Sequence, residues 1–242
     1  MRSAFFLILF GLTIHATSQD KVSFHAEDGL KITADLYLID FSEPFILLFH
    51  QAESSRGEYN DIAPRLNKLG YNCLAVDLRS GQKSNYVKNE TALRASRQNI
   101  SSRFIDSQKD IEAAINYVLK YNQKPVILFG SSYSASLALI MASNNPRVSS
   151  VIAFSPGEYF RPEVIVQEEI SELNQPVFIA ASEIEYPYVK EITSAVVSSK
   201  KMLFKPSQSR GVHGAKALWE TNEGNSEYWL VLSQFFKVLR EI

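Results

Sequence analysis

The clearest structural signal in this chain is the stretch PVILFGSSYS at residues 125–134, which the apolar run ASLALIMA at residues 135–142 follows directly. Its first half is a run of β-branched, leucine and aromatic residues that breaks at Gly130, as a buried strand does. The second run is rich in alanine and leucine, which favour a helix. We therefore predict a strand, a very tight turn with Ser132 at its tip, and a buried helix. Such a turn holds a serine hydroxyl clear of the backbone, as a nucleophile requires.

The turn nearly matches the pattern Gly-x-Ser-x-Gly. Gly130 and Ser134 flank Ser132 at two residues on either side, where small side chains are needed because the strand and the helix nearly touch. Ser134 departs from the pattern, although serine is only slightly larger than glycine. Ser131 is the rival nucleophile, but it would place a tyrosine in the tight flank of the turn. A purely structural turn is the remaining alternative.

The composition is that of an ordinary globular protein. The chain has 242 residues, 45% of them hydrophobic and 21% charged, enough for one large domain with a substantial core. A net charge of −1 offers no global electrostatic case for nucleic-acid binding. Cys73 is the single cysteine, and its strand-like surroundings indicate a buried thiol. Four scattered histidines offer no metal-ligand spacing, and no cofactor-binding motif is present.

The N-terminal segment has the features of a secretory signal peptide. Arg2 supplies a positive charge, residues 4–14 are almost wholly apolar, and Ala16-Thr17-Ser18 resembles a cleavage site. The apolar core is shorter than the roughly 20 residues that a spanning helix needs, and an uncleaved membrane anchor is the alternative. We therefore predict that residues 1–18 are a signal peptide, that the protein is exported to the periplasm or secreted, and that no stable membrane span remains after cleavage.

From Val22 onward, strand signals alternate with helix signals. Residues 22–26 and 30–38 flank Asp28-Gly29, which is typical of a β-hairpin. Further apolar runs, typical of buried strands, lie at residues 45–49, 73–76, 126–129, 151–154, 177–181 and 202–204. The pattern predicts one α/β domain over residues 19–242, with a mostly parallel sheet covered by helices on both faces and an N-terminal antiparallel hairpin.

Apolar residues recur at helical spacing between these strands. Ser55 and Glu58 fit a capping box before the first helix, and Gly70 would end it. Other helices are predicted around residues 111–119, 189–196 and 228–239.

The segment from Arg79 to Arg103 is polar and basic, with six lysines and arginines against a single acid, Glu90. Because it follows a strand, it should lie at the carboxyl edge of the sheet, where open α/β sheets bind ligands. A solvated loop with the start of a helix is the simpler interpretation. A basic flap that favours acidic substrates is the alternative.

The order of these features resembles that of the α/β-hydrolase superfamily, closest in outline to its small, capless, dienelactone-hydrolase-like members. The resemblance covers nearly all of the mature chain and rests on the strand order, the turn at Ser132 and several loop motifs in the expected sequence. It implies a single-domain α/β-hydrolase fold and a serine hydrolase that cleaves an ester or related acyl bond in a small-molecule substrate. A peptidase or thioesterase of the same fold, or an inactive binding protein on this scaffold, are the alternatives.

The resemblance also implies a catalytic triad in the order serine, acid, histidine, with Ser132 as the nucleophile. His213 lies in the loop after the last predicted strand, where the family places its base. Glu185 lies in the loop after the strand that commonly precedes the family's acid, whose task is to orient the histidine. Glu183 and Glu158 are the alternative acids.

A second loop resembles the family's oxyanion-hole segment. His50-Gln51-Ala52 follows the strand at residues 45–49, with glutamine where the family has glycine. The resemblance implies that the backbone amide of Ala52, or alternatively that of Gln51, acts with the amide of Tyr133 to stabilise developing negative charge. The His50 side chain would brace the loop. Residues 77–84 resemble the family's structural Asp-x-Arg-Gly-x-Gly-x-Ser turn.

Overall fold

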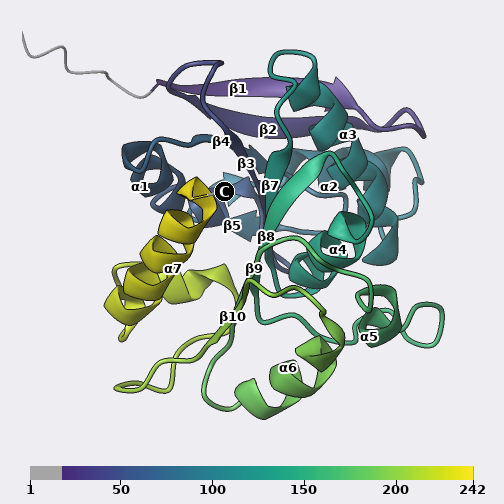
Figure 1. Ribbon diagram of the computed structural model, residues 1–242. Helices are drawn as coiled ribbons and strands as arrows, with labels where there is room; N and C mark the ends of the chain where they lie inside the picture. Colours follow the sequence, from purple (N-terminus) through teal and green to yellow (C-terminus); the bar gives the residue numbers. More distant parts are fainter. Residues whose placement is uncertain (1–17, 242) are drawn as a thin grey trace, which may run out of the picture.

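The computed structural model describes residues 18–241 and contains a large twisted sheet between two layers of helices (Figure 1). The predicted signal peptide lies outside these residues, apart from Ser18. The eight strands of the sheet follow the order β1-β2-β4-β3-β7-β8-β9-β10. Their bounds are β1 Ser18–His25, β2 Lys31–Leu38, β3 Phe45–Phe49, β4 Asn72–Val76, β7 Val126–Ser131, β8 Val148–Phe154, β9 Val177–Ala180 and β10 Lys201–Phe204. A separate two-stranded sheet joins β5 Lys83–Ser84 to β6 Val87–Lys88.

The strand pairing confirms the predicted mixture of a hairpin and a parallel sheet. β1 and β2 pair antiparallel around Gly29, whose φ of 82° favours glycine, and β2 pairs antiparallel with β4. From β4 to β10 every neighbouring pair is parallel. The carboxyl ends of these strands therefore meet at one edge of the sheet, which brings together the loops after β3, β7, β8, β9 and β10.

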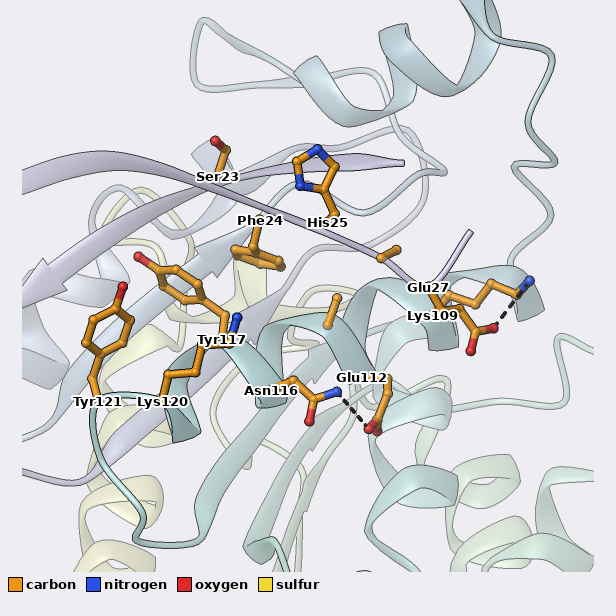
Figure 2. A pocket seen from close by; sticks show the side chains of 12 residues that line it. Ser23, Phe24, His25, Glu27, Lys109, Glu112, Asn116, Tyr117, Lys120 and Tyr121 are labelled. Atoms are coloured by element: carbon orange, nitrogen blue, oxygen red, sulfur yellow. Dashed lines mark hydrogen bonds and ion pairs between the residues drawn. The ribbon is translucent and has the colours of Figure 1, made fainter. Parts of the chain in front are cut away.

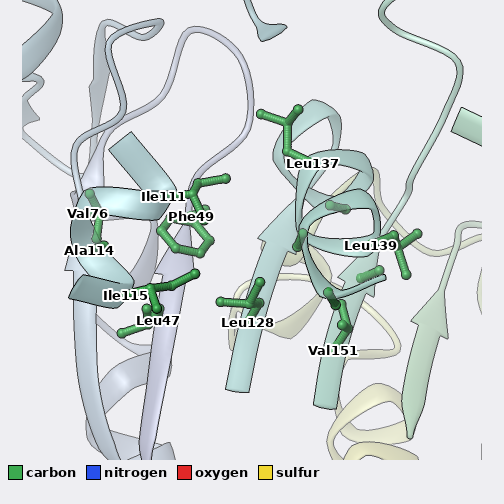
Figure 3. Close-up of a cluster of buried hydrophobic side chains, with 14 of the residues drawn as sticks. Leu47, Phe49, Val76, Ile111, Ala114, Ile115, Leu128, Leu137, Leu139 and Val151 are labelled. Carbon is green, nitrogen blue, oxygen red and sulfur yellow. The ribbon is translucent and has the colours of Figure 1, made fainter. Parts of the chain in front are cut away.

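Helices cover both faces of the sheet because its central strands are apolar on both sides. Along β3, Leu47 and Phe49 belong to one buried cluster and Ile46 and Leu48 to the other. The first cluster packs α3 and α4 on the sheet, and Figure 3 shows it; the second packs α1 and α7 on the opposite face. The helices are α1 Ile62–Lys68, α2 Glu90–Arg97, α3 Gln108–Leu119, α4 Tyr133–Ala142, α5 Val166–Glu169, α6 Tyr186–Ile192 and α7 Asn225–Arg240. Short 3₁₀ helices are η1 Arg56–Tyr59, η2 Ile105–Ser107, η3 Thr193–Ala195 and η4 Ala215–Leu218.

Ser55 and Glu58 do not form the predicted capping box with each other. Ser55 caps η1 rather than α1, and its Oγ accepts a hydrogen bond from the Gly57 amide at 3.2 Å. The Glu58 carboxylate does not return to Ser55. It accepts instead from the Gln51 amide at 3.1 Å, so that η1 is tied to the loop after β3.

Buried ion pairs give Arg79, the first cation of the basic segment, a structural role. Arg79 is 1% exposed and pairs with Asp110 at 2.8 Å and with Asp28 at 2.7 Å. Farther along, Arg94 bonds to the Thr33 hydroxyl at 2.6 Å. These contacts fasten the turn after β4 to α3 and fasten α2 to β2. At the end of the segment, Arg103 is paired with carboxylates.

Cys73 lies in β4 and is fully buried, as its surroundings in the sequence predict. Burial raises the pKa of its thiol, which keeps the thiol protonated and unreactive. Within residues 18–241, no helix has the length and apolar character needed to cross a bilayer.

Candidate active site

The turn between β7 and α4 has the tight geometry that its sequence predicts. Ser132 separates the strand from the helix and has φ 61° and ψ −124°, outside the usual regions for a residue with a side chain. A Cβ placed on Gly130 would lie 2.3 Å from Ser134 O and 2.5 Å from Ala135 Cα, both of them backbone atoms. Only glycine therefore allows the strand and the helix to approach so closely.

Ser134 occupies the position where the motif has its second glycine, and the structure explains the substitution. Its Oγ lies 2.7 Å from the carbonyl oxygen of Phe49, at the end of β3, and accepts a hydrogen bond from the Ser131 amide at 2.9 Å. The hydroxyl thus ties the turn to the neighbouring strand. Serine at this position therefore makes a polar contact that glycine could not make.

The two adjacent serines have different surroundings. Ser131 is fully buried, and its Oγ accepts a hydrogen bond from the Ala215 amide at 2.8 Å. Ser132 is 5% exposed and lies near Tyr159. Burial raises the pKa of the Tyr159 hydroxyl, and the Ser132 side chain offsets only part of that rise. Ser131 therefore joins the turn to the next loop of the site, and Ser132 is the serine with access to solvent.

His213 and Glu185 meet at the same edge of the sheet, from the loops after β10 and β9. His213 Nδ1 is hydrogen-bonded to Glu185 Oε1. The second carboxylate oxygen, Oε2, accepts from Ser155 Oγ at 2.8 Å and from the amide and Oγ of Ser182 at 3.1 and 2.8 Å. Burial alone would raise the pKa of Glu185, but the hydrogen bonds from His213, Ser182 and Ser155 together outweigh it and lower the pKa to about 2. The carboxylate is therefore ionised at neutral pH.

The two alternative acids do not contact His213. The Glu158 carboxylate accepts from the amides of Val166 and Gln167 at 2.8 and 3.0 Å, and so caps α5. Glu183 is exposed at the surface. Of the three candidate acids, Glu185 alone is hydrogen-bonded to the histidine among the described residues.

Backbone contacts hold the histidine loop against the turn that carries Ser132. The Gly214 amide donates to Ser155 Oγ at 3.0 Å, and the next amide, of Ala215, reaches Ser131. Gly214 has a φ of 74°, and a Cβ there would lie 2.6 Å from Ser131 Oγ. Among residues 18–241, no hydrogen bond joins Ser132 to His213. In unliganded sites such bonds are often long and tighten only when a substrate binds.

Of the two alternative backbone donors predicted in the loop after β3, Ala52 and Gln51, only Ala52 has a free amide in the described part of the chain. The Gln51 amide is already bound to Glu58, whereas the amides of Ala52 and Tyr133 donate to no acceptor within the described part of the chain. His50 braces the loop, as its position predicts: its ring accepts from the Leu78 amide at 3.0 Å and approaches the Gln51 carbonyl at 2.7 Å. Burial lowers the pKa of His50, which keeps the ring neutral.

Ser155 and Tyr159 belong to the site, although the sequence pattern does not single them out. Both lie in the loop after β8, between the loops of Ser132 and Glu185. Ser155 contacts the Glu185 carboxylate and the Gly214 amide, and Tyr159 lies near the Ser132 side chain. The available signal was their place directly after a buried parallel strand, where polar side chains often serve a site.

A cavity on another part of the molecule does not belong to this site. It has a volume of about 570 Å³ and lies between β1 and α3, lined by Phe24, Lys109, Tyr117 and their neighbours (Figure 2). None of the candidate catalytic residues lines it. Within residues 18–241, no cluster of three or more His, Cys, Asp or Glu side chains could hold a metal ion.

Comparison with known proteins places this fold and site in context. The model of the family described as serine aminopeptidase, S33, matches residues 42–202 of the chain. No curated protein matches its sequence. The dienelactone hydrolase of Anabaena variabilis has 17% identity and a TM-score of 0.69, over 92% of this chain and 98% of its own.

Two further solved structures extend this comparison. An esterase from Pyrococcus furiosus has 19% identity and a TM-score of 0.67, over 91% of this chain and 92% of its own. The esterase domain of a Rhodothermus marinus protein has 14% identity and a TM-score of 0.62, over 90% and 97%. At such identities the likeness establishes a shared fold, and the activity has to be argued from the site.

Proposed function

This chain belongs to the α/β-hydrolase family described as serine aminopeptidase, S33, and on that premise we propose that it is a serine hydrolase that cleaves a carboxylic ester or a related acyl bond. The observation that carries the proposal is the hydrogen bond from His213 to the ionised Glu185, beside the strained turn that presents Ser132. An acid, an imidazole and an accessible serine at one edge of the sheet are the parts that acyl transfer through a covalent intermediate requires.

In the first half of the proposed reaction, Ser132 Oγ attacks the carbonyl carbon of the substrate while His213 Nε2 takes the serine proton. Glu185 holds the Nδ1–H of His213 and stabilises the imidazolium that forms. The unengaged amides of Ala52 and Tyr133 donate to the tetrahedral oxyanion. The intermediate collapses when the C–O bond to the leaving group breaks and His213 gives its proton to the departing alcohol.

In the second half, water replaces the alcohol. His213 accepts a proton from the water as its oxygen attacks the acyl carbon, and the same two amides stabilise the second tetrahedral oxyanion. Its collapse breaks the bond to Ser132 Oγ, which regains a proton from His213, and the carboxylic acid leaves. Losing one such backbone donor typically lowers turnover by about 10²–10³.

Ser132→Ala tests the proposal directly. We expect the variant to lose measurable turnover of 4-nitrophenyl butyrate, because the acyl-enzyme cannot form, and to keep the unfolding temperature of the wild type within a few degrees. A fluorophosphonate probe should modify the wild-type protein, with the adduct located at Ser132 by peptide mass spectrometry. Undiminished turnover in Ser132→Ala would overturn the assignment.

Ser131→Ala is the matched control for the neighbouring hydroxyl. It leaves the buried Ala215 amide without its acceptor, which costs about 1–3 kcal/mol of stability. The probe should still react at Ser132 in this variant. If neither the wild type nor Ser131→Ala takes up the probe, the chain is an inactive binding protein on a hydrolase scaffold.

The family's description raises aminopeptidase activity as a second candidate. An aminopeptidase must hold the free ammonium group of its substrate, for which a carboxylate is the usual partner. Glu185 and Glu158, at this edge of the sheet, already accept hydrogen bonds on both oxygens. Glu183, which is exposed in the same loop as Glu185, is the carboxylate that an ammonium group could reach. Turnover of alanine 4-nitroanilide faster than that of 4-nitrophenyl butyrate would favour the aminopeptidase.

A further inference from the structure

A small cavity lies next to the turn that carries Ser132. It has a volume of about 240 Å³ and is formed by the chain around η2 and by the loop after β8. Its lining includes three aromatic rings, of Phe104, Tyr159 and Phe160, and the charged side chains of Arg103, Arg161 and Glu163.

Two of these rings, of Phe104 and Tyr159, lie beside the turn that carries Ser132. Phe104 stacks on the ring of Tyr133, the residue after Ser132, with centroids 4.4 Å apart and planes inclined by 18°. The Tyr159 hydroxyl lies near the Ser132 side chain. A group in the cavity would therefore lie beside residues that contact the turn that carries Ser132.

The rings are partly open to solvent and held in place. Phe104 is 36% exposed and Tyr159 39% exposed, so each has apolar surface left to bury. The Tyr159 hydroxyl donates to the Ser155 carbonyl at 3.2 Å. Its ring also lies so close to Gly157 that a Cβ there would be 2.9 Å from two ring carbons. Rings that are already ordered lose little conformational entropy when a ligand binds.

The charges that line the cavity are compensated. Arg103 is hydrogen-bonded to Glu163 at 2.8 Å and to Asp106 at 3.1 Å. Arg161 lies 3.5 Å from the Glu158 carboxylate. Since both guanidinium groups have carboxylate partners, the cavity offers no uncompensated positive charge to an anionic group. An uncharged ligand suits it better.

We propose that this cavity binds a flat, uncharged aromatic group of the ester that Ser132 cleaves. The inference rests on the proposed function and adds a substrate class to it. The volume is below the roughly 300–1,000 Å³ of pockets that enclose a drug-sized ligand, so the cavity takes one ring and not the whole substrate. Offset or edge contacts with Phe104 and Tyr159 select a planar ring over a puckered one.

Two pairs of esters test the proposal and identify the half of the substrate that carries the ring. Methyl phenylacetate and methyl cyclohexylacetate differ only in the ring of the acyl half. Benzyl acetate and cyclohexylmethyl acetate differ only in the ring of the alcohol half. In one of the two pairs, kcat/KM measured by acid release should favour the flat ring about tenfold. Phe104→Leu should bring that ratio close to one and change kcat/KM for the cyclohexyl ester less than about threefold.

Phe41→Leu is the matched control. Phe41 is 43% exposed and stacks on Tyr121 with centroids 5.4 Å apart, but it does not line the cavity. The flat-ring preference should survive in this variant.

Two results would overturn the proposal. The first is a kcat/KM that shows no flat-ring preference in either pair of esters. The second is an equal loss of kcat/KM for flat and puckered rings in Phe104→Leu, which would mean that Phe104 only supports Tyr133. If Ser132 takes up the fluorophosphonate and esters are cleaved, either result refutes the aromatic subsite alone. If the probe does not react and no ester is cleaved, the proposed function and the subsite fall together.

Discussion

Ser155 joins the proposed acid to the backbone of the histidine loop. Its Oγ donates to Glu185 at 2.8 Å and accepts from the Gly214 amide at 3.0 Å, and the residue is 2% exposed. Its φ of 54° lies in the left-handed region, which costs a serine roughly 1–3 kcal/mol. Such strain persists only where the surrounding contacts over-determine it. We infer that Ser155 is a positioning residue, which acts on the substrate only through Glu185 and His213.

Ser155→Ala and Ser155→Gly separate the hydroxyl from the backbone strain. Both variants lack the hydroxyl, so we expect each to lower kcat about 10- to 100-fold through misplacement of the acid and the histidine loop. Glycine adopts a φ of 54° without strain, and so Ser155→Gly should unfold at a temperature equal to or above that of Ser155→Ala. Ester turnover and thermal unfolding of both variants provide the measurement. Wild-type kcat in Ser155→Gly would show that the hydroxyl has no positioning role.

The contact between β7 and α4 depends on a missing side chain at Gly130. A methyl group there would meet Ser134 O and Ala135 Cα at 2.3 and 2.5 Å, and backbone atoms cannot rotate away. Gly130→Ala should therefore displace the start of α4, lower the free energy of unfolding by more than about 3 kcal/mol and reduce ester turnover sharply. Urea denaturation and turnover of the soluble fraction test both effects.

Gly29→Ala is the control for the conformational effect alone. Gly29 has a φ of 82°, and a Cβ there would meet nothing within 4 Å. Its replacement should cost only about 1 kcal/mol, from backbone strain in the hairpin turn. If the two variants lose equal stability, close packing of the strand against the helix is not what requires glycine at residue 130.

The elements could be predicted from sequence where local pattern and burial agree. The apolar runs of β3 and β7 are such cases, because a strand buried on both faces excludes most polar residues. The predicted end of the second strand at Gly130 is wrong, since β7 continues through Gly130 to Ser131. Glu58 shows where prediction from a local motif fails. Its spacing from Ser55 fits a helix cap, but in the folded chain its carboxylate meets the Gln51 amide from the loop after β3. The partner of a buried charge is set by tertiary contacts, which a local motif does not contain.

At the scale of the molecule, the strand order determines which loops form the site. Ser132, Ser155 and Glu185 follow β7, β8 and β9, which are neighbours in the sheet. The resemblance to a known family predicts the order Ser132, Glu185 and His213, and the hydrogen bond between Glu185 and His213 agrees with that order. The contribution of Ser155 could not be predicted, since it depends on how closely the loop after β8 approaches both Glu185 and Gly214.

Glu185 also makes the stability of the whole molecule depend on pH. Its pKa in the folded protein is about 2, below the ordinary value of 4.5, because hydrogen bonds to the carboxylate outweigh burial. A group whose folded pKa is lowered stabilises the protein above the unfolded pKa and loses that contribution as the pH falls toward the folded pKa. Because Glu185 is partly exposed, solvent screening reduces this contribution at neutral pH to about 1–2 kcal/mol.

The comparison of wild type with Glu185→Gln isolates this contribution. In urea denaturation, the difference between their free energies of unfolding should be constant from about pH 7 to pH 5.5 and should shrink progressively below about pH 4.5. Glu183→Gln, which removes an exposed carboxylate two residues away, is the matched control and should change stability little throughout. A wild-type advantage over Glu185→Gln that stays constant down to about pH 3 would mean that its hydrogen bonds do not favour the ionised carboxylate. The acid would then lack the charge that it needs to stabilise an imidazolium at His213.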